Sequence, residues 1–463
     1  MHKFDRRTFL RLLGQGTAVL GMGLSGGTWA QAGVARGSSG GPKFTSGKYQ
    51  TFQPGVYFDW EKKMVEERLE QARNPRRQQE GGGPPGGGGP TVITEDEILA
   101  YNKTWDPYNP LFSDKEYARK AGYPSVPAFP NFQSARGNAP SAIPMDFGDR
   151  WFYANDGSDV RVWTHIFAGD SFTSEPEKSE FTELTVPGSD LRHFLLGASA
   201  KLYNAKGEQV GWTYGNTREA YKKIIDGSPP PTYSESISEW TEYFPAGHYT
   251  TDEEYEYIKE LWDREYIRGS QKLYWEDVNV GDEPIWTCDG PIGYQDLNTL
   301  HGGGGRTSLR GSRENLKIMF RDKYGIYYGI AAMHHGARNI PNARSVFYNH
   351  TAALLMTRMV TNYIGDAGLV TRLCWKFKQV FKEMQVERFQ GGDILDKVPY
   401  MKGKMCTVHP SEGDTVIAKG YVTDKYVNDR GEHTIDISAW AETLDEKIIE
   451  VVEYSAKLPS KKG

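Results

Sequence analysis

The sequence predicts an α+β protein of two similar units, each an antiparallel sheet wrapped around a central helix. Three observations support this prediction. The chain has 463 residues, which is too long for one ordinary domain. Strand-like runs rich in β-branched and aromatic residues occur in two groups, from about residue 159 and again from about residue 369. Short helical segments precede each group, so the two halves share one plan.

The N-terminus carries the features of an export signal. Arg6 and Arg7 precede the apolar run LLGQGTAVLGMGL, which is too short and too rich in glycine to span a membrane. Ala30 and Ala32 then provide the small residues of a cleavage site. Residues 1–32 therefore resemble a twin-arginine signal, the alternative being an ordinary secretory signal. We expect the twin-arginine translocation machinery as a partner and a periplasmic location.

Composition suggests where the two units begin and end. The signal peptide is followed by a flexible and partly helical extension that contains the breaker segment EGGGPPGGGGP. A proline cluster closes the first unit, and an acidic, aromatic connector leads to the second. The expected divisions are the signal at 1–32, the extension at 33–95, the first unit at 96–232, the connector at 233–272 and the second unit at 273–460.

Local signals define several elements. Thr94 and Glu97 form a capping-box pattern before a short helix, and the NAKGEQ stretch predicts a hairpin turn at Asn204 and Gly207. In the second unit, residues 342–366 have the strongest helical pattern, with an apolar stripe and Gly365 placed to end the helix. Strands are predicted to follow it, two of them joined by the turn NDRGEH.

Charge and cysteine content narrow the classes of function. The net charge of −5 gives no electrostatic reason to bind nucleic acid. The three cysteines show no metal-ligand spacing, and the His334–His335 doublet lacks a recognisable third ligand. The glycine-rich stretches lack the context of a phosphate-binding loop. We therefore expect no metal and no organic cofactor.

Two stretches share an Asp, an Asn and a hydrophobic residue at similar spacing. Residues 296–301 read DLNTLH, and residues 106–112 read DPYNPLF. The later stretch ends in a histidine, whereas Phe112 ends the earlier one. On residue type alone, such an Asp and Asn often form a turn, and a lone histidine beside glycines is often a surface residue. The alternative is an acid–base pair in the second unit and a site in the first unit that no longer functions.

Several stretches resemble a known family. DVNVGDE, DLNTLH, TAALLMTRMVTNYIGD and AWAETLDEKIIEVVEYSAKL are similar to successive landmarks of the MaoC-like hotdog dehydratases and (R)-specific enoyl-CoA hydratases. The signature of that family is D-x-N-P-[LIV]-H, and the resemblance covers about residues 96–225 and 273–457. It implies two hotdog domains in tandem that form a pseudo-dimer, with a working site in one half and a degenerate site in the other.

The resemblance also implies roles for individual residues. Asp296 and His301 match the catalytic pair. Two departures reshape the region, because Thr299 replaces the family proline and glycines 302–305 replace a helix-forming run. A long glycine-rich insertion beside a site is typical of a lid or a reshaped mouth. The implied substrate-binding residues are Asn298, His335, Gly336 and Phe112.

A carboxylate and an imidazole suit the addition of water to a conjugated double bond, or its removal. One group orients and deprotonates the water, a proton reaches the adjacent carbon, and donors stabilise the enolate oxygen. Histidine exchanges protons near neutrality because its ordinary pKa is about 6.5. This chemistry requires no cofactor.

The export signal constrains the substrate. Coenzyme A is an intracellular carrier, so the favoured hypothesis is an exported hydro-lyase acting on a free, bulky, apolar carbonyl compound. The alternative is a non-catalytic periplasmic binding protein for an apolar ligand, and a hotdog thioesterase is a third class. The sequence leaves open the substrate, the direction of the reaction and the formation of a homodimer.

Overall fold

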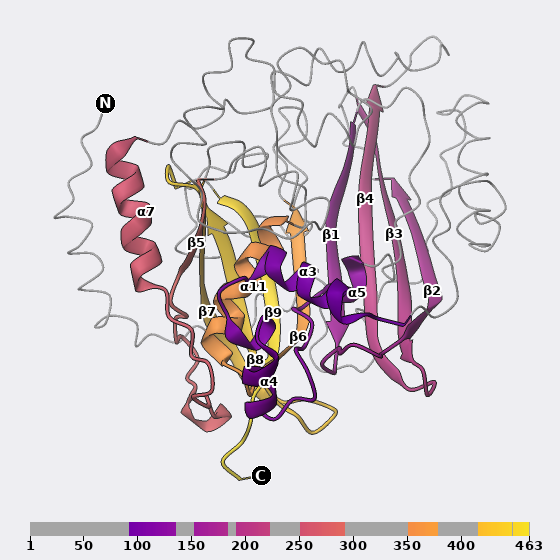
Figure 1. The fold of residues 1–463 in the computed structure, drawn as a ribbon. Helices are drawn as coiled ribbons and strands as arrows, with labels where there is room; N and C mark the ends of the chain where they lie inside the picture. Colours follow the sequence, from indigo (N-terminus) through magenta and orange to yellow (C-terminus); the bar gives the residue numbers. More distant parts are fainter. Residues whose placement is uncertain are drawn as a thin grey trace.

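The computed structural model describes seven parts of the chain, and these contain one large antiparallel sheet with few helices (Figure 1). The described residues are 92–135, 152–183, 191–222, 251–291, 351–377, 415–446 and 448–462. The expected signal peptide at 1–32 lies outside them, as does nearly all of the extension at 33–95. No helix in the described parts is long and apolar enough to cross a membrane.

Nine strands form the sheet in the order β2-β3-β4-β1-β6-β9-β8-β7-β5. Every pair of neighbours is antiparallel. The strands are β1 (Phe152–Val162), β2 (Phe172–Glu183), β3 (Leu191–Asn204), β4 (Gln209–Lys222), β5 (Thr287–Asp289), β6 (Leu369–Phe377), β7 (Val416–Val427), β8 (His433–Glu442) and β9 (Ile448–Lys457).

The strand order repeats on either side of the β1–β6 pair. Outward from β1 come β4, β3 and β2, and outward from β6 come β9, β8 and β7, so each half places its strands in the same sequence. The short strand β5 adds an outer edge to the second half only. Across the β1–β6 seam the buried carboxylate of Asp159 accepts hydrogen bonds from Arg372, with Nε 3.1 Å from Oδ1. The halves therefore share one hydrogen-bonded sheet.

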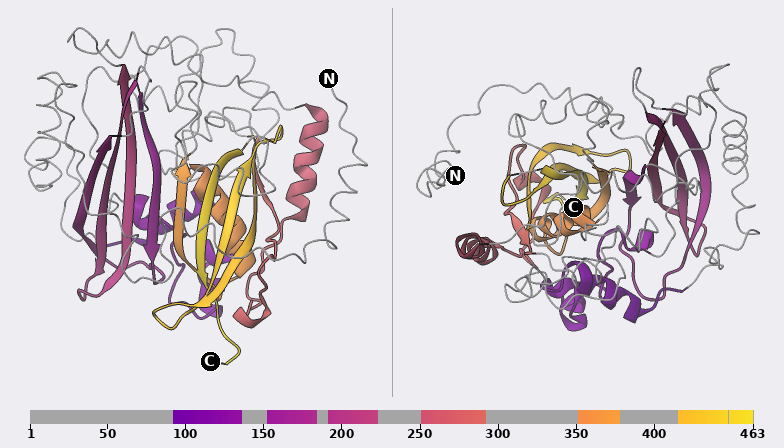
Figure 2. Two further views of the ribbon diagram at one scale, coloured as in Figure 1. Left: turned by 180° about the vertical axis from the view of Figure 1, so that it is seen from behind. Right: turned by 90° about the horizontal axis from the view of Figure 1, so that it is seen from above.

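Helix α11 (Thr351–Ile364) lies inside the curve of the second half of the sheet (Figure 2). It contacts β5, β6, β7, β8 and β9, which explains why its side chains are buried on every face rather than along one stripe. Gly365 ends it with a φ of 70°, as the sequence predicts. This is the expected sheet wrapped around a central helix. The first part of the predicted helix, 342–350, lies outside the described residues.

The helical segment at the start of the first half packs against α11 rather than standing apart from it. This segment comprises α3 (Glu95–Trp105), η3 (Pro110–Phe112), α4 (Lys115–Lys120) and α5 (Phe132–Ala135). The predicted capping box is confirmed, since Thr94 and Glu97 each bond the other's backbone amide. One hydrophobic core includes buried residues of this segment, of β1 and of α11. The packing of the first half therefore depends on the second.

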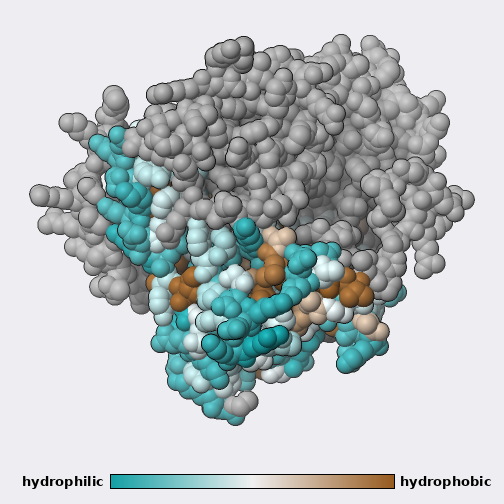
Figure 3. All heavy atoms as spheres, in the orientation of Figure 1, coloured by the Kyte–Doolittle hydropathy of each residue, from teal (hydrophilic) through white to brown (hydrophobic). Residues whose placement is uncertain are grey.

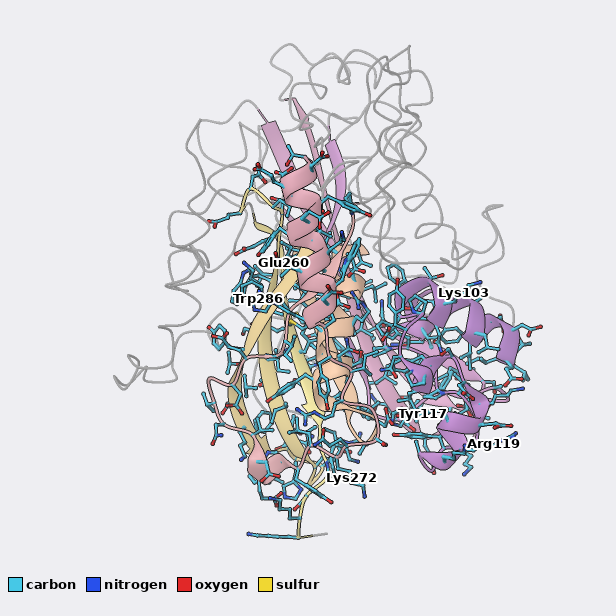
Figure 4. The ribbon with its side chains drawn as sticks, turned by 60° about the vertical axis from the view of Figure 1, so that its left-hand side comes forward. Lys103, Tyr117, Arg119, Glu260, Lys272 and Trp286 are labelled. Atoms are coloured by element: carbon cyan, nitrogen blue, oxygen red, sulfur yellow. The ribbon has the colours of Figure 1, made fainter. Side chains whose placement is uncertain are left out.

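A helix occupies the expected connector. Helix α7 (Asp252–Arg264) begins with a second capping box, Thr251 with Glu254. Its apolar side packs Ile258, Leu261 and Trp262 around Cys288 of β5 and Ile417 of β7. Figure 4 shows α7 lying along the strands, with Trp286 close to it. The sequence interpretation treated this stretch only as a connector.

Both predicted hairpin turns are confirmed. In the β3–β4 turn the side-chain oxygen of Asn204 accepts hydrogen bonds from the amides of Lys206 and Glu208, and Gly207 has a φ of 76°. The β7–β8 turn repeats this pattern with Asn428 and Gly431. In both turns an Asx-type hydrogen bond precedes a left-handed glycine.

Candidate functional site

Most of the predicted site residues fall outside the described part of the chain. Asp296, Asn298, His301, His335 and Gly336 lie between Pro291 and Thr351, outside the described residues. Phe112 is the exception. The described residues include the earlier motif and a pocket beside it. They also include β5 and α11, which precede and follow the later motif in the sequence.

The earlier motif forms a rigid corner. Asp106 follows α3, and its Oδ1 accepts a hydrogen bond from the amide of Asn109 at 3.3 Å. Asn109 in turn caps η3, with its Oδ1 accepting from the amide of Leu111 at 3.0 Å, and Pro110 occupies the first position of the helix. Phe112 is buried, with 5 % of its surface exposed. The Asp and Asn thus have a local structural role.

Asn102 holds this corner against the next loop. Its side-chain amide donates to the carbonyl oxygens of Phe112 and Pro127, at 2.8 and 2.9 Å, and its oxygen accepts from the amide of Phe129 at 2.7 Å. All three bonds are buried, so breaking any one leaves an unpaired polar group. Sequence reasoning missed Asn102, although a polar residue on the buried side of an amphipathic helix was a usable signal.

A pocket lies between this corner, the end of β1 and the C-terminal end of α11. Its cavity volume is about 50 Å³, within about 570 Å³ of empty space that includes open solvent. The rings of Phe112 and Phe129 form part of its wall and meet edge to face, with centroids 5.2 Å apart. Its other lining residues come from four places in the chain and include Leu111, Asn131 and Gln133 in the helical segment, Val162 at the end of β1 with His165 after it, Thr361 and Ile364 in α11, and Val370 in β6.

His165 is the titratable residue among those lining the pocket. Its Nε2 lies 3.3 Å from the hydroxyl of Tyr123, and the Tyr123 hydroxyl also donates to the backbone oxygen of Asp366. Loss of hydration, with a smaller contribution from Lys457, lowers the pKa of His165 below its ordinary value. The imidazole is therefore neutral at neutral pH.

A buried charge cluster joins α11 to β5 and α7. Arg358 has 1 % of its surface exposed and makes two bonds with the carboxylate of Glu265, at 2.7 and 3.1 Å. It also lies 3.3 Å from Oδ1 of Asp289, which is equally buried. Glu265 accepts a further hydrogen bond from the amide of Cys288 at 2.8 Å. Because the charges are paired, their burial is tolerated.

The earlier motif belongs to the same neighbourhood. Burial raises the pKa of Asp106 to about 7, while the nearby Arg358 guanidinium opposes that rise and the Asp289 carboxylate adds to it. The guanidinium also lies 5.9 Å from the centre of the Tyr108 ring. The motif of the first half is therefore in electrostatic contact with the central helix of the second half.

In the sequence, members of this cluster lie on both sides of the later motif. Asp289 lies a few positions before Asp296, and Arg358 is in the helix that follows the insertion. Sequence reasoning missed Arg358, Glu265 and Asp289. A single arginine within the apolar helix pattern was the available signal, since a cation there needs buried acidic partners.

Glu450 is a second buried acid that the sequence did not single out. It lies on β9, and both carboxylate oxygens are buried without a hydrogen-bond partner. Burial raises its pKa well above the usual range. Four residues along, the hydroxyl of Tyr454 donates to the backbone oxygen of Ala353 in the first turn of α11 at 3.0 Å. Glu450 is thus an acid whose ionised form is disfavoured by its burial in the core.

One family model matches the chain. Residues 83–211, which include the earlier motif and much of the pocket wall, match the model described as the FAS1-like, dehydratase domain region. The match covers less than a third of the 463 residues. No curated protein sequence matches the chain.

Solved structures with similar folds include hotdog proteins. A MaoC-like dehydratase is 15 % identical with a TM-score of 0.48, covering 80 % of this chain and 95 % of its own. A putative MaoC domain protein dehydratase from Chloroflexus aurantiacus is 13 % identical with a TM-score of 0.43, covering 81 % of this chain and 94 % of its own. A conserved hypothetical protein from Mycobacterium tuberculosis, described as having a double hotdog fold, is 12 % identical with a TM-score of 0.40. The match covers 80 % of this chain and 93 % of that protein. These likenesses say nothing about the reaction.

Proposed function

We infer that this chain is a hydro-lyase of the MaoC-like type, which adds or removes water at a double bond conjugated to a carbonyl group. The observation that carries the inference is the match of residues 83–211 to a dehydratase domain region. The sheet wrapped around α11 agrees with it, because this is the arrangement expected of a hotdog unit. The repeated strand order supports a tandem pair of such units acting as a pseudo-dimer.

In this proposal Asp296 and His301 hold the reacting water between a carboxylate and an imidazole. One of them takes a proton from the water as its oxygen bonds to carbon, and a proton reaches the adjacent carbon. The first amides of the central helix are suited to the enolate oxygen. Asn298, His335 and Gly336 contact the substrate or order its surroundings.

The buried cluster supports the second half as the catalytic one. Arg358 ties the end of β5 to α11, and these two elements precede and follow the later motif in the sequence. In the first half, Phe112 stands where an imidazole is needed, so that half supplies enclosure rather than a proton.

The proposed substrate class follows from the expected periplasmic location. Residues 1–32 direct the folded protein out of the cytoplasm, where coenzyme A thioesters are made and used. We therefore propose a free carbonyl compound with a bulky apolar body, and the partially apolar pocket beside Phe112 agrees with such a body.

A second candidate is a non-catalytic periplasmic binding protein. The observation that favours it is the character of the described pocket, in which Phe112 replaces the histidine and the imidazole present, His165, is held neutral. Such a pocket retains a ligand without exchanging protons with it.

The deciding experiment offers the purified chain a panel of free enones and 3-hydroxy carbonyl compounds in ¹⁸O-labelled water. For the native chain we expect label in the new hydroxyl group of a hydrated enone, or formation of enone from a 3-hydroxy compound, and either rate is expected to fall at least about a hundredfold in Asp296→Asn and in His301→Ala. Asp96→Asn and His433→Ala, which repeat the two substitutions away from the motif, are expected to retain turnover. Full turnover in either motif variant contradicts the assigned roles, and binding without turnover favours the binding protein.

A further inference from the structure

The described surface offers no large apolar patch on the face shown in Figure 3, where hydrophobic residues form small separate groups among hydrophilic ones. The pocket beside Phe112 is a stronger candidate for recognition, because it combines an apolar wall with polar groups that have no partner. Its chemistry can be deduced from described residues alone.

Two side chains lining the pocket carry unused hydrogen-bonding atoms. Gln133 has 1 % of its surface exposed, and its Nε2 donor has no partner. Asn131 has 8 % exposed, and its Oδ1 acceptor has none either. A buried polar group without a partner is costly, so each of these atoms favours a ligand that completes it.

The backbone at Asn131 adopts a conformation that is unfavourable for most residues. Asn131 has a φ of 71°, a conformation that asparagine tolerates better than most residues. The preceding carbonyl, that of Pro130, is fixed by the hydroxyl of Tyr101 at 3.2 Å. The turn that carries both amides is thus held in place from α3.

The pocket is built for an uncharged group. Its described lining contains no lysine, arginine, aspartate or glutamate, and its imidazole is neutral. An anion would lose its hydration without gaining a cationic partner there. Beside these polar atoms the wall is apolar, with Phe112, Phe129, Val162 and Ile364.

We propose that this pocket binds the neutral hydrogen-bonding end of an apolar molecule, an alcohol or a primary amide, through Asn131 and Gln133. A hydroxyl group supplies both a donor for Asn131 and an acceptor for Gln133, whereas an ester or ketone supplies only the acceptor. The proposal concerns residues remote in sequence from Asp296 and His301, and it holds for an enzyme and for a binding protein alike.

Calorimetric titration with octan-1-ol and with octanoate at pH 7.5 tests the proposal, since the two probes share a chain length and differ in charge. We expect the native chain to bind octan-1-ol at least about tenfold more tightly than octanoate. Tighter or equal binding of octanoate overturns the proposal, as does no binding of octan-1-ol.

Two variants separate recognition from folding. Gln133→Leu and Asn131→Gly each remove one unused polar atom, and glycine keeps the left-handed conformation. Each is expected to weaken octan-1-ol binding about tenfold. Gln133→Leu is expected to leave the melting temperature of the unliganded chain unchanged or raised, because it removes an unpaired buried amide.

Gln271→Leu, the same change at an exposed residue that does not line the pocket, is the matched control and is expected to bind as the native chain does. Native affinity in both pocket variants overturns the proposal, and so does a lowered melting temperature in Gln133→Leu, which would indicate a structural role. The double variant Asp296→Asn/His301→Ala is expected to bind normally, so this test does not depend on turnover.

Discussion

The role of Asp106 in the fold differs from the catalytic role that its motif suggests. In the first-half motif it occupies the place of a catalytic acid, yet its described contacts are local and electrostatic. It bonds the amide of Asn109 and faces Arg358 and Asp289 in the buried cluster. The corner it stabilises places Phe112 on the pocket wall.

Asp106 is expected to make stability depend on pH. Burial raises its pKa to about 7, above the value of about 3.9 in an unfolded chain. The folded state therefore binds this proton more tightly, so the stabilisation is complete below about pH 4 and is lost as the pH rises through about 7.

The Asp106→Asn variant removes this titration and keeps an acceptor for the amide of Asn109. Between pH 4 and 8, the free energy of unfolding of the native chain is expected to fall relative to the variant by at most about 4 kcal/mol. Urea unfolding across that range measures it, with exposed Asp96→Asn as the control. Parallel profiles of the native chain and Asp106→Asn would contradict the prediction.

At the scale of elements, the end of α11 is closely constrained by its neighbours. Gly365 has a φ of 70°, and a Cβ at this position would lie 2.9 Å from the backbone oxygen of Gly269. The amide of Asp366 bonds to that same oxygen, while the Asp366 carboxylate accepts from Tyr117 at 2.8 Å. Figure 4 shows Tyr117 on the side of its helices that faces the rest of the molecule.

Gly365→Ala is expected to cost more stability than Gly207→Ala. Both glycines have a φ near 70° and share the conformational penalty of about 1 kcal/mol, but nothing lies within 4 Å of a Cβ at Gly207. Crowding against the Gly269 backbone is expected to add about 1–3 kcal/mol at Gly365. Thermal unfolding of both variants measures the difference, and equal melting temperatures would show that the end of α11 relaxes freely.

At the scale of the whole molecule, polar contacts tie together parts that are distant in sequence. Asp159 and Arg372 bridge the seam between the halves, and the cluster around Arg358 joins α7, β5 and α11 beside the earlier motif. Because they and the shared core link the two halves, we expect the halves to unfold together.

Arg358→Met is expected to lower the free energy of unfolding by about 3–5 kcal/mol, because it removes the guanidinium that forms ion pairs with the buried carboxylates of Glu265 and Asp289. Adding Glu265→Gln is expected to restore part of this loss, since one of those carboxylates is then neutral. Chemical denaturation measures the double-mutant cycle, with Arg264→Met at an exposed position of α7 as the control. Strict additivity of the two losses would show that the pair does not interact.

The sequence by itself determined the elements that depend on neighbouring residues. Thr94 with Glu97, Asn204 with Gly207, and Gly365 at the end of α11 are local signals, and the structure confirms each one. It also predicted the sheet around a central helix, from the alternation of strand and helix patterns. Helix α7 was missed although Thr251 and Glu254 gave the same capping signal, because its charged surface hid an apolar side.

Only the tertiary structure brought Arg358 to Glu265 and Asp289, and Asn131 and Gln133 to His165. These residues lie far apart in the chain, and their types are ordinary. What makes them a site is loss of water around them, which depends on how the segments pack and leaves no local pattern. The catalytic roles of Asp296 and His301 stay predictions from the motif, and the labelled-water experiment tests them.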